Sequence, residues 1–319
     1  MGTASAAKHE PDRRHRIEAQ RAAARRKQLQ SRLLMAGGAV VVVIIVVVAL
    51  VLVNVNSAPP EKVPPNDGPT GTALATTVRD LTTVPASVLD AVGGGNLSTA
   101  DIGSPTAAGG GYLTPVTGSQ LTAGGKPEVL YVGADFCPYC AAVRWPLIVA
   151  LSRFGTFSGL TTTRSSLQNG AGQAEVYPGT PTWTFYGSTY ASAYLNFTAV
   201  ELNTNVPDPS TGSYTALQSL TQAQQSTMSS FDPGGGFPFV DLGNAYVQLS
   251  VLVPYSPQDL ARKTWPQITA AITGGQASSL GKEIDASANY LTAGICKLTG
   301  NKPATACTPA VKALQPRLG

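Results

Sequence analysis

Histidine is nearly absent from this sequence of 319 residues. The two that occur, His9 and His15, lie within the first 32 residues, so the rest of the chain contains no imidazole. Ser-His-Asp and Cys-His catalysis depend on that side chain, and so do most zinc enzyme sites. These chemistries are therefore excluded for residues 33–319.

Charged residues are scarce and unevenly distributed. Residues 1–32 contain nine Lys or Arg and three acidic residues, a net charge of +6, whereas the whole chain has +4, so residues 33–319 have −2. Residues 33–53 contain no charged side chain, and an apolar helix of that length crosses a hydrocarbon core of roughly 30 Å. The basic residues precede this run, which predicts a single-pass helix in membrane lipid with its N-terminus in the cytoplasm. The basic tail then marks topology, and we expect no nucleic-acid partner.

The region after the predicted membrane helix shows patterns of both strands and helices. Val129–Val132 is a compact apolar run typical of a central strand, and Cys137 and Cys140 follow it. Apolar residues then recur at helical spacing over 141–154, with Pro146 inside the helix. Further strands are predicted over 160–166, 181–190, 193–202, 238–242 and 245–253, and helices over 80–92, 215–231, 256–272 and 276–298.

From the cysteine pair onward, this order is that of a thioredoxin-like fold. A βαβ half is followed by a ββα half, here with an insertion between them. We predict an α/β thioredoxin-like domain preceded by one N-terminal transmembrane helix. The predicted segments are a basic cytoplasmic tail (1–32), the transmembrane helix (33–53), a flexible linker (54–77), an irregular N-terminal extension (78–125), the thioredoxin-like extracytoplasmic domain (126–310) and a C-terminal tail (311–319).

Cys137 and Cys140 form a Cys-Pro-Tyr-Cys motif at the start of a predicted helix. Unpaired amides and the helix dipole stabilise a thiolate there, and a thiolate is the attacking species in disulfide exchange. We expect Cys137 to be the exposed nucleophile and Cys140 the buried resolving thiol, with Pro138 fixing the turn and Tyr139 beside it. A structural disulfide and half of a zinc site are the alternatives, and the redox interpretation is preferred because the pair lies between a strand and a helix.

The other two cysteines, Cys296 and Cys307, flank a loop of ten residues. Their spacing is poor for a zinc knuckle, and extracytoplasmic thiols tend to oxidise. We predict a structural disulfide between them; a relay that passes electrons to Cys137 and Cys140 is the alternative.

A thioredoxin-type site also needs a cis-proline loop whose edge binds substrate backbone. Pro181 has the sequence separation of a minimal thioredoxin, whereas Pro238, after Phe237, is followed by the predicted hairpin and helix. We choose Pro238, with Phe237 at the substrate edge.

Three further residues lie close to the cysteine pair in the sequence. Asp135 is expected to cap or solvate the turn, or else to accept a proton. Arg144 is expected on a solvated helix face, although it could also lower a thiol pKa or bind substrate. Trp145 is expected in the core.

Several separate blocks resemble the family of membrane proteins called domain of unknown function 929. That resemblance covers about residues 75 to 310 and implies a thioredoxin-like protein. The matching blocks are Gly133–Ala142, Arg144–Trp145, Ala150–Gly155, Thr180–Thr182, Phe237–Asp241 and Ile295–Gly300.

The expected function is thiol–disulfide exchange with extracytoplasmic protein thiols and disulfides. Neither a metal nor an organic cofactor is expected, and a membrane redox partner would reoxidise the cysteines. The alternative is a non-catalytic binding or scaffold module that keeps the fold, with the cysteines as staples and residues 181–205 as the binding surface.

Overall fold

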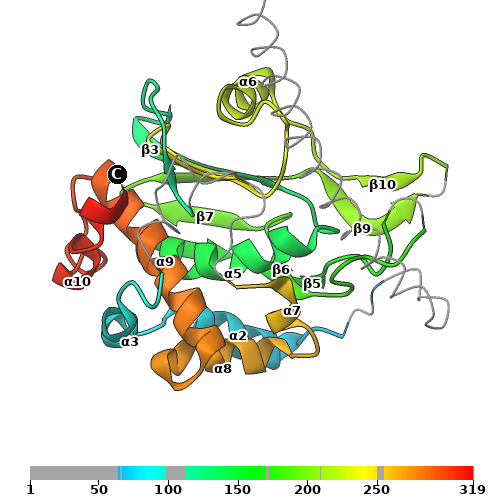
Figure 1. The fold of residues 1–319 in the computed structure, drawn as a ribbon, viewed down its shortest axis with the longest axis horizontal. Coiled ribbons are helices and arrows are strands. Elements are labelled where there is room, and N and C mark those ends of the chain that lie inside the picture. The colour runs from blue at the N-terminus through cyan, green and yellow to red at the C-terminus, as the bar shows by residue number, and fades with distance from the viewer. Residues whose placement is uncertain are drawn as a thin grey trace, which may run out of the picture. The chain divides into compact units, whose positions relative to one another are not determined.

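The computed structural model describes residue 64 and residues 67–97, 112–169, 172–208, 210–249 and 255–318. They form a mixed α/β domain with a central sheet and helices on both of its faces, which confirms the predicted α/β class (Figure 1). No helix within these ranges has the length and apolar character needed to span a bilayer. The predicted transmembrane helix, residues 33–53, lies outside the described residues.

The strand that precedes the cysteine pair lies in the middle of the central sheet. This strand, β3 (Lys126–Gly133), pairs in parallel with β8 (Asn196–Glu201) and antiparallel with β11 (Phe239–Leu242). Hydrogen bonds on both sides therefore fix the end of β3 from which the cysteine-containing loop departs. Three more strands complete the sheet: β12 (Tyr246–Gln248) beside β11, β1 (Thr114–Pro115) beside β12, and β2 (Thr122–Ala123) beside the start of β3.

β3 buries side chains on both faces of the sheet. Val129 and Tyr131 belong to the larger of two hydrophobic cores, and Leu130 and Val132 belong to the smaller. Successive side chains of a strand point to opposite faces, so the two cores lie on opposite sides of the sheet. A strand buried in this way has a continuous apolar sequence, which is why it could be predicted.

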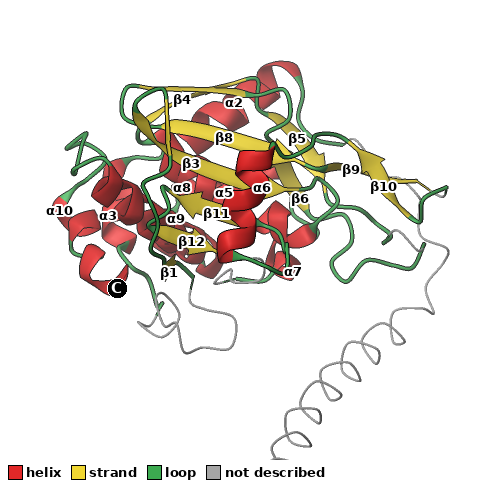
Figure 2. Ribbon diagram, turned by 90° about the horizontal axis from the view of Figure 1, so that it is seen from above, coloured by secondary structure: helices red, strands yellow, loops and turns green. Residues whose placement is uncertain are grey.

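Helices cover the two faces unequally. α5 (Pro138–Ser152) and α9 (Ser279–Leu298) pack on each other on one face, whereas α6 (Gln222–Phe231) lies alone on the other and contributes Met228 to the smaller core (Figures 1 and 2). An outer layer packs on α5 and α9: α2 (Gly71–Thr82), α3 (Ala86–Val92), α8 (Trp265–Thr273) and the 3₁₀ turn η1 (Gly275–Ala277).

The predicted hairpin between β11 and β12 is present. Its turn places Gly243 and Asn244 at φ values of 64° and 56°. Glycine and asparagine adopt this left-handed region most readily. The carboxylate of Asp241 accepts a hydrogen bond from the Asn244 amide at 2.7 Å, which closes the turn.

The segment between α5 and β11 contains three small two-stranded sheets. β6 (Pro181–Thr184) is fully buried, whereas β7 (Thr189–Ser192) alternates exposed and half-buried residues and Tyr186 is 50% exposed, so only part of residues 181–205 is available for the alternative binding surface. The pairs are β4 (Gly155–Ser158) with β7 (Thr189–Ser192), β5 (Thr161–Arg164) with β6 (Pro181–Thr184), and β9 (Asn203–Asp208) with β10 (Ser213–Ala216).

Predicted boundaries differ from the structure at both ends of the domain. α2 begins at Gly71, so residues 71–77 of the predicted linker form a helix that packs against α8. The extension predicted to be irregular continues this helix and also contains α3, β1 and β2. The predicted C-terminal tail includes the end of α10 (Pro309–Lys312) and η2 (Gln315–Leu318), and Leu318 is completely buried.

One predicted helix is instead two. Residues 256–272 form α7 (Pro257–Leu260) and α8, and between them Arg262 has a positive φ of 63°. Thr264 caps the second helix, and Pro266 lies in its first turn, where its missing N–H costs no hydrogen bond. The first helix therefore ends before this point, and a separate helix begins after it.

The predicted disulfide between Cys296 and Cys307 is confirmed. The bond joins the last turn of α9 to the segment before α10, with the two Cα atoms 5.7 Å apart, and both cysteines are buried. It fastens the C-terminal segment to the helix that packs on α5.

Candidate functional site

Cys137 occupies the N-cap position of α5. Its backbone is extended, Pro138 takes the first helical position, and the Cys137 Sγ accepts a hydrogen bond from the Cys140 amide at 3.3 Å. The free amides of a helix N-terminus and the helix dipole favour negative charge at this position. The local sequence thus places the first sulfur where a thiolate is stabilised.

The two thiols differ in acidity. Burial acts to raise the pKa of Cys137, but hydrogen bonds from Cys140 and the positive charge of Arg144 outweigh it and lower that pKa below its ordinary value. Cys140 is completely buried, and burial together with the neighbouring Cys137 sulfur raises its pKa well above the ordinary value. Both cysteines are free thiols. Cys137 therefore has the properties of a nucleophile, and Cys140 those of a thiol that keeps its proton.

Burial of Cys140 was predicted, but the expectation of an exposed Cys137 is wrong. Only 6% of Cys137 is exposed. Its Sγ lies 4.0 Å from the carbonyl oxygen of Phe237, whose ring meets that of Phe136 edge to face with centroids 5.7 Å apart. Sequence gives no indication of this contact, because it joins residues about a hundred positions apart.

The peptide bond between Phe237 and Pro238 is cis and faces the first cysteine. The Sγ of Cys137 lies 4.0 Å from the carbonyl oxygen of Phe237, and Pro238 immediately precedes β11, the neighbour of β3. Pro181, the other proline considered, begins β6, and its carbonyl accepts a hydrogen bond from the indole of Trp145 at 3.2 Å. Pro238 is thus the proline beside the cysteines, and Trp145 is in the core as predicted.

A buried ion pair lies one helical turn after Cys140. Arg144 is completely buried, and its Nε and Nη2 atoms donate to the carboxylate of Glu201 at 3.0 and 2.6 Å. The prediction that Arg144 lies on a solvated helix face is wrong, because β8 brings Glu201 to the same buried place. This two-point geometry is the strongest form of the Arg–carboxylate interaction.

Asp135 is the second carboxylate of this cluster. Its Oδ1 lies 3.5 Å from Nη2 of Arg144, the residue is only 8% exposed, and Cys137 rather than Asp135 caps the helix, so the expectation that Asp135 caps or solvates the turn is wrong. Burial raises the pKa of Asp135 to about 6, Arg144 opposes that rise, and Glu201 adds to it. A carboxyl group with this pKa can gain or lose a proton near neutral pH, which the proton-acceptor alternative requires.

Tyr131 packs against Arg144 and is the fourth residue of this buried cluster, with Glu201 and Asp135. Its ring centroid lies 5.7 Å from the guanidinium carbon of Arg144, and its buried hydroxyl has no hydrogen-bond partner among the described residues. The hydroxyl folds over Gly133, where an added Cβ would lie 2.1 Å from the Tyr131 oxygen. Glycine is therefore required at this position for the ring to reach the arginine.

Pro146 interrupts the hydrogen bonds of α5. Proline has no N–H, so the carbonyl of Ala142, four residues earlier, loses its helical partner. The hydroxyl of Tyr255 donates to this carbonyl at 2.5 Å. A side chain from the C-terminal part of the chain thus completes the helix that carries both cysteines.

Five rings belong to residues beside the cysteine pair or pack against such residues, and we call them the aromatic collar. Phe136 stacks on Tyr214 with centroids 3.8 Å apart, and Tyr139 meets Tyr177 edge to face at 5.8 Å. Phe237 contacts Phe136 and is the fifth member. Such ring pairs hold one another in fixed orientations, which gives the surface around Cys137 a defined apolar shape.

Three members of this site, Glu201, Tyr177 and Tyr214, were not predicted. An acidic residue at the end of the apolar strand 196–201 is the one signal that could have drawn attention to Glu201. The two tyrosines carry no such signal, since each reaches the site only through the folding of the inserted segment.

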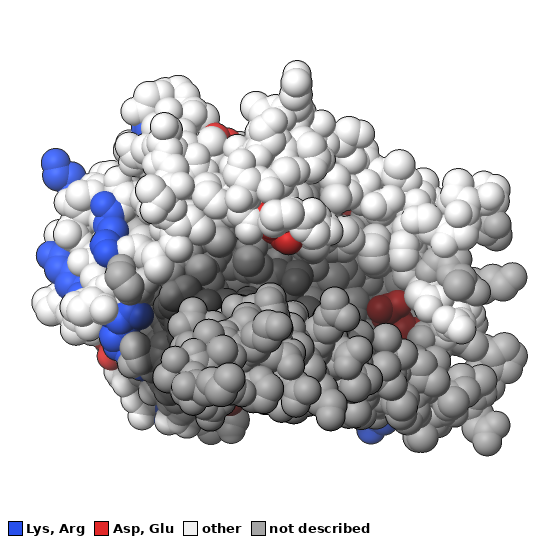
Figure 3. All heavy atoms as spheres, turned by 45° about the horizontal axis from the view of Figure 1, so that its top comes forward, with Lys and Arg blue, Asp and Glu red and all other residues white. Residues whose placement is uncertain are grey.

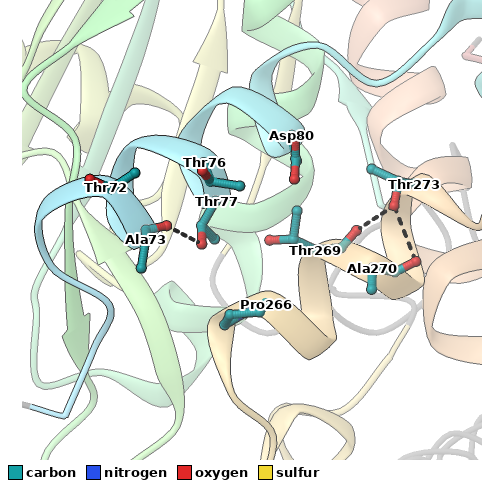
Figure 4. Close-up of a pocket in the computed structure, with 9 residues that line it drawn as sticks. All are labelled: Thr72, Ala73, Thr76, Thr77, Asp80, Pro266, Thr269, Ala270 and Thr273. Carbon is teal, nitrogen blue, oxygen red and sulfur yellow. Dashed lines mark hydrogen bonds between the residues drawn. The ribbon is translucent and has the colours of Figure 1, made fainter.

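One pocket lined by described residues lies elsewhere. It has a volume of about 340 Å³ and lies between α2 and α8 (Figure 4). Hydroxyl groups and one carboxylate line it, and no residue of the cysteine site does. Its lining residues are Thr72, Ala73, Thr76, Thr77, Asp80, Pro266, Thr269, Ala270 and Thr273.

Comparison with known proteins identifies one family. Residues 112–215 match the sequence model of the domain of unknown function DUF929, which confirms the predicted resemblance over that range. The matched range contains the cysteine pair, Arg144, Glu201 and Tyr214. No curated protein and no solved structure matches the chain.

Proposed function

We propose that the chain is a membrane-anchored thiol–disulfide oxidoreductase with a thioredoxin-like fold, acting on extracytoplasmic protein thiols and disulfides. The observation that carries the proposal is the difference in pKa between two thiols within one helical turn. The Cys137 sulfur accepts a hydrogen bond at the helix N-terminus, and its pKa is lowered. Cys140 is completely buried, and its pKa is raised. Disulfide exchange needs this pair of properties, whereas a structural staple does not.

The strand order supports the thioredoxin-like fold. The sequence β8-β3-β11-β12 has a parallel pair followed by two antiparallel pairs, as the two halves of such a fold require. The cysteines follow the central strand, and the cis Phe237–Pro238 bond precedes the adjacent one. α5 and α9 lie on one face and α6 on the other, which agrees with the same architecture.

In the reductive direction, the thiolate of Cys137 attacks one sulfur of a substrate disulfide. A Cys137–substrate bond forms, and the other substrate sulfur leaves as a thiolate. Cys140 then attacks the Cys137 sulfur, its proton passes to the departing substrate sulfur, and the second substrate thiol is released. The substrate gains two electrons and the cysteine pair becomes a disulfide; the oxidative direction is the reverse.

The sequence supports the proposed location of the protein in a membrane. The uncharged run 33–53 would hold the protein in lipid, and the basic tail before it would keep the N-terminus in the cytoplasm. A membrane redox partner would then restore the cysteine pair after each cycle, and the reaction itself uses neither a metal nor an organic cofactor.

The test is the reduction potential of the Cys137/Cys140 pair in the detergent-solubilised chain. The Cys296→Ala/Cys307→Ala variant serves as the control that assigns the signal to the first pair. A potential near or above about −200 mV supports an oxidase or isomerase, and one near about −270 mV supports a reductase. A potential well below about −300 mV with slow exchange refutes the enzyme and leaves a stapled binding module.

A further inference from the structure

Two groups of rings stand on either side of Cys137. Phe136, which precedes it, is packed between Tyr214 and Phe237, and Tyr139, two residues after it, is packed against Tyr177. Ring faces of this kind attract cations as well as apolar groups. Phe136, Tyr139, Tyr177 and Phe237 are half-buried, so their exposed parts are suited to contact a side chain that has both characters.

A single hairpin connects the two ring groups. The carbonyl of Gln168 accepts a hydrogen bond from the Tyr214 hydroxyl, and Gln168 also pairs with Ala174 across the hairpin. The next residue, Glu175, donates its amide to the carbonyl of Leu167 at 3.0 Å. Glu175 thus follows directly after the part of the hairpin that contacts the first ring group.

The same residue is close to the second ring group. Tyr177, the ring partner of Tyr139, lies two residues further along the chain. The negative charge of Glu175 acts on both Tyr139 and Tyr214, which belong to different ring groups. Glu175 therefore lies near both ring groups, on the segment that joins them.

This carboxylate has no cation to pair with among the residues that the structure describes. Burial raises the pKa of Glu175, and its neighbour Val176 is 48% exposed, so the surroundings are partly apolar. Arg144 is buried against Glu201, and Arg164 is bound to Asp67 by two hydrogen bonds of 2.6 and 2.8 Å.

One group of basic side chains lies at another end of the molecule. In Figure 3, Lys and Arg gather where α10 lies, whereas Figure 1 shows that α5 begins toward β9 and β10. Near the start of α5, the described residues offer the carboxylate of Glu175 and the rings of the aromatic collar.

We propose that Glu175 and the tyrosines of the aromatic collar form a subsite for a lysine or arginine side chain next to the reacting cysteine of a polypeptide substrate. The inference rests on the proposed function and names its substrate class. The cationic group would meet Glu175, and the aliphatic stem would lie against the rings. Glutathione and similar anionic thiols are disfavoured, because the described part of the collar presents no cation to their carboxylates.

The experiment uses the reduced, detergent-solubilised full chain and three peptides. Each peptide has one cysteine in a mixed disulfide with thionitrobenzoate, flanked by lysines, glutamines or glutamates. Attack by Cys137 releases thionitrobenzoate, whose absorbance gives the second-order rate constant. We expect the lysine peptide to react about fivefold to tenfold faster than the glutamine peptide at low salt, and the glutamate peptide to be slowest.

Variants separate the subsite from general electrostatic attraction. Glu175→Gln should bring the lysine and glutamate rates to within about twofold of each other, and reaction of this variant with the glutamine peptide shows that it is folded. Glu283→Gln, which changes another part-buried glutamate on α9, should leave all three rates as they are. Tyr177→Phe should keep the preference and Tyr177→Leu should reduce it, because the ring rather than the hydroxyl attracts the cation.

Two results overturn the inference, and they are distinguishable. If the glutamine peptide reacts but the three rates are equal, or the preference persists in Glu175→Gln, the subsite is refuted while the proposed function stands. If no peptide reacts, both are refuted.

Discussion

Removing the charge of Glu201 is expected to destabilise the domain strongly. Glu201 is completely buried and receives two hydrogen bonds from Arg144, at 3.0 and 2.6 Å, and one from the Phe185 amide at 3.3 Å. Loss of one partner from a buried ion pair costs about 3–5 kcal/mol, since the other charge is left uncompensated. Asp135 still lies near Arg144, so we expect about 3 kcal/mol for Glu201→Gln, a large part of the roughly 5–15 kcal/mol that holds a domain together.

The measurement is guanidinium unfolding followed by tryptophan fluorescence, because Trp145, Trp183 and Trp265 are all buried. The double variant Arg144→Met/Glu201→Leu should recover most of the loss, since apolar pairs replace buried ion pairs without a large penalty. Glu283→Gln is the control and should change the free energy of unfolding by less than about 0.5 kcal/mol. The reasoning is refuted if Glu201→Gln is as stable as the wild type, or if the double variant is no more stable than the single one.

Three further predictions concern the thiols, a buried acid and the disulfide. The rate of Cys137 alkylation by iodoacetamide, plotted against pH, should have a midpoint below the ordinary thiol pKa of about 8.5. Mass spectrometry should show that Cys140 is unlabelled at pH 7, and equal labelling of both cysteines would contradict the assignment. Burial raises the pKa of Asp285 to about 8, above its unfolded value of about 4, so the folded state binds more protons and stability should fall as pH rises between these values. Asp285→Asn should remove that part of the slope between pH 5 and 8, and an unchanged slope would show that Asp285 is ionised. Cys296→Ala/Cys307→Ala should lower the free energy of unfolding by about 2–4 kcal/mol without altering the alkylation rate of Cys137; an altered rate would indicate a relay.

Features set by short stretches of sequence could be predicted. β3 was identified by its apolar run, the start of α5 by the cysteine pair with proline, and the β11–β12 hairpin by Gly243 and Asn244. Each of these signals reflects a local requirement: burial on both faces, a helix N-terminus, and positive φ angles.

Features that depend on contacts between residues far apart in the sequence could not be predicted. Arg144 is buried only because Glu201, 57 residues later, meets it, and no local pattern distinguishes such an arginine from one on a solvated helix face. The burial of Cys137 likewise involves a distant residue, Phe237, which lies 100 positions later in the sequence. The break between α7 and α8 is different, since Pro266 was available as a signal of a new helix within the predicted one.

The contact between Tyr255 and Ala142 has a consequence for the order of folding. The two residues are 113 positions apart, and the helix with the cysteines stays one hydrogen bond short until Tyr255 arrives. Contacts between distant residues form late, because the intervening loop must first be closed. On a growing chain, Cys137 and Cys140 are therefore made long before their helix is complete. The helix that carries both thiols is completed only when Tyr255, in the last third of the protein, has been synthesised.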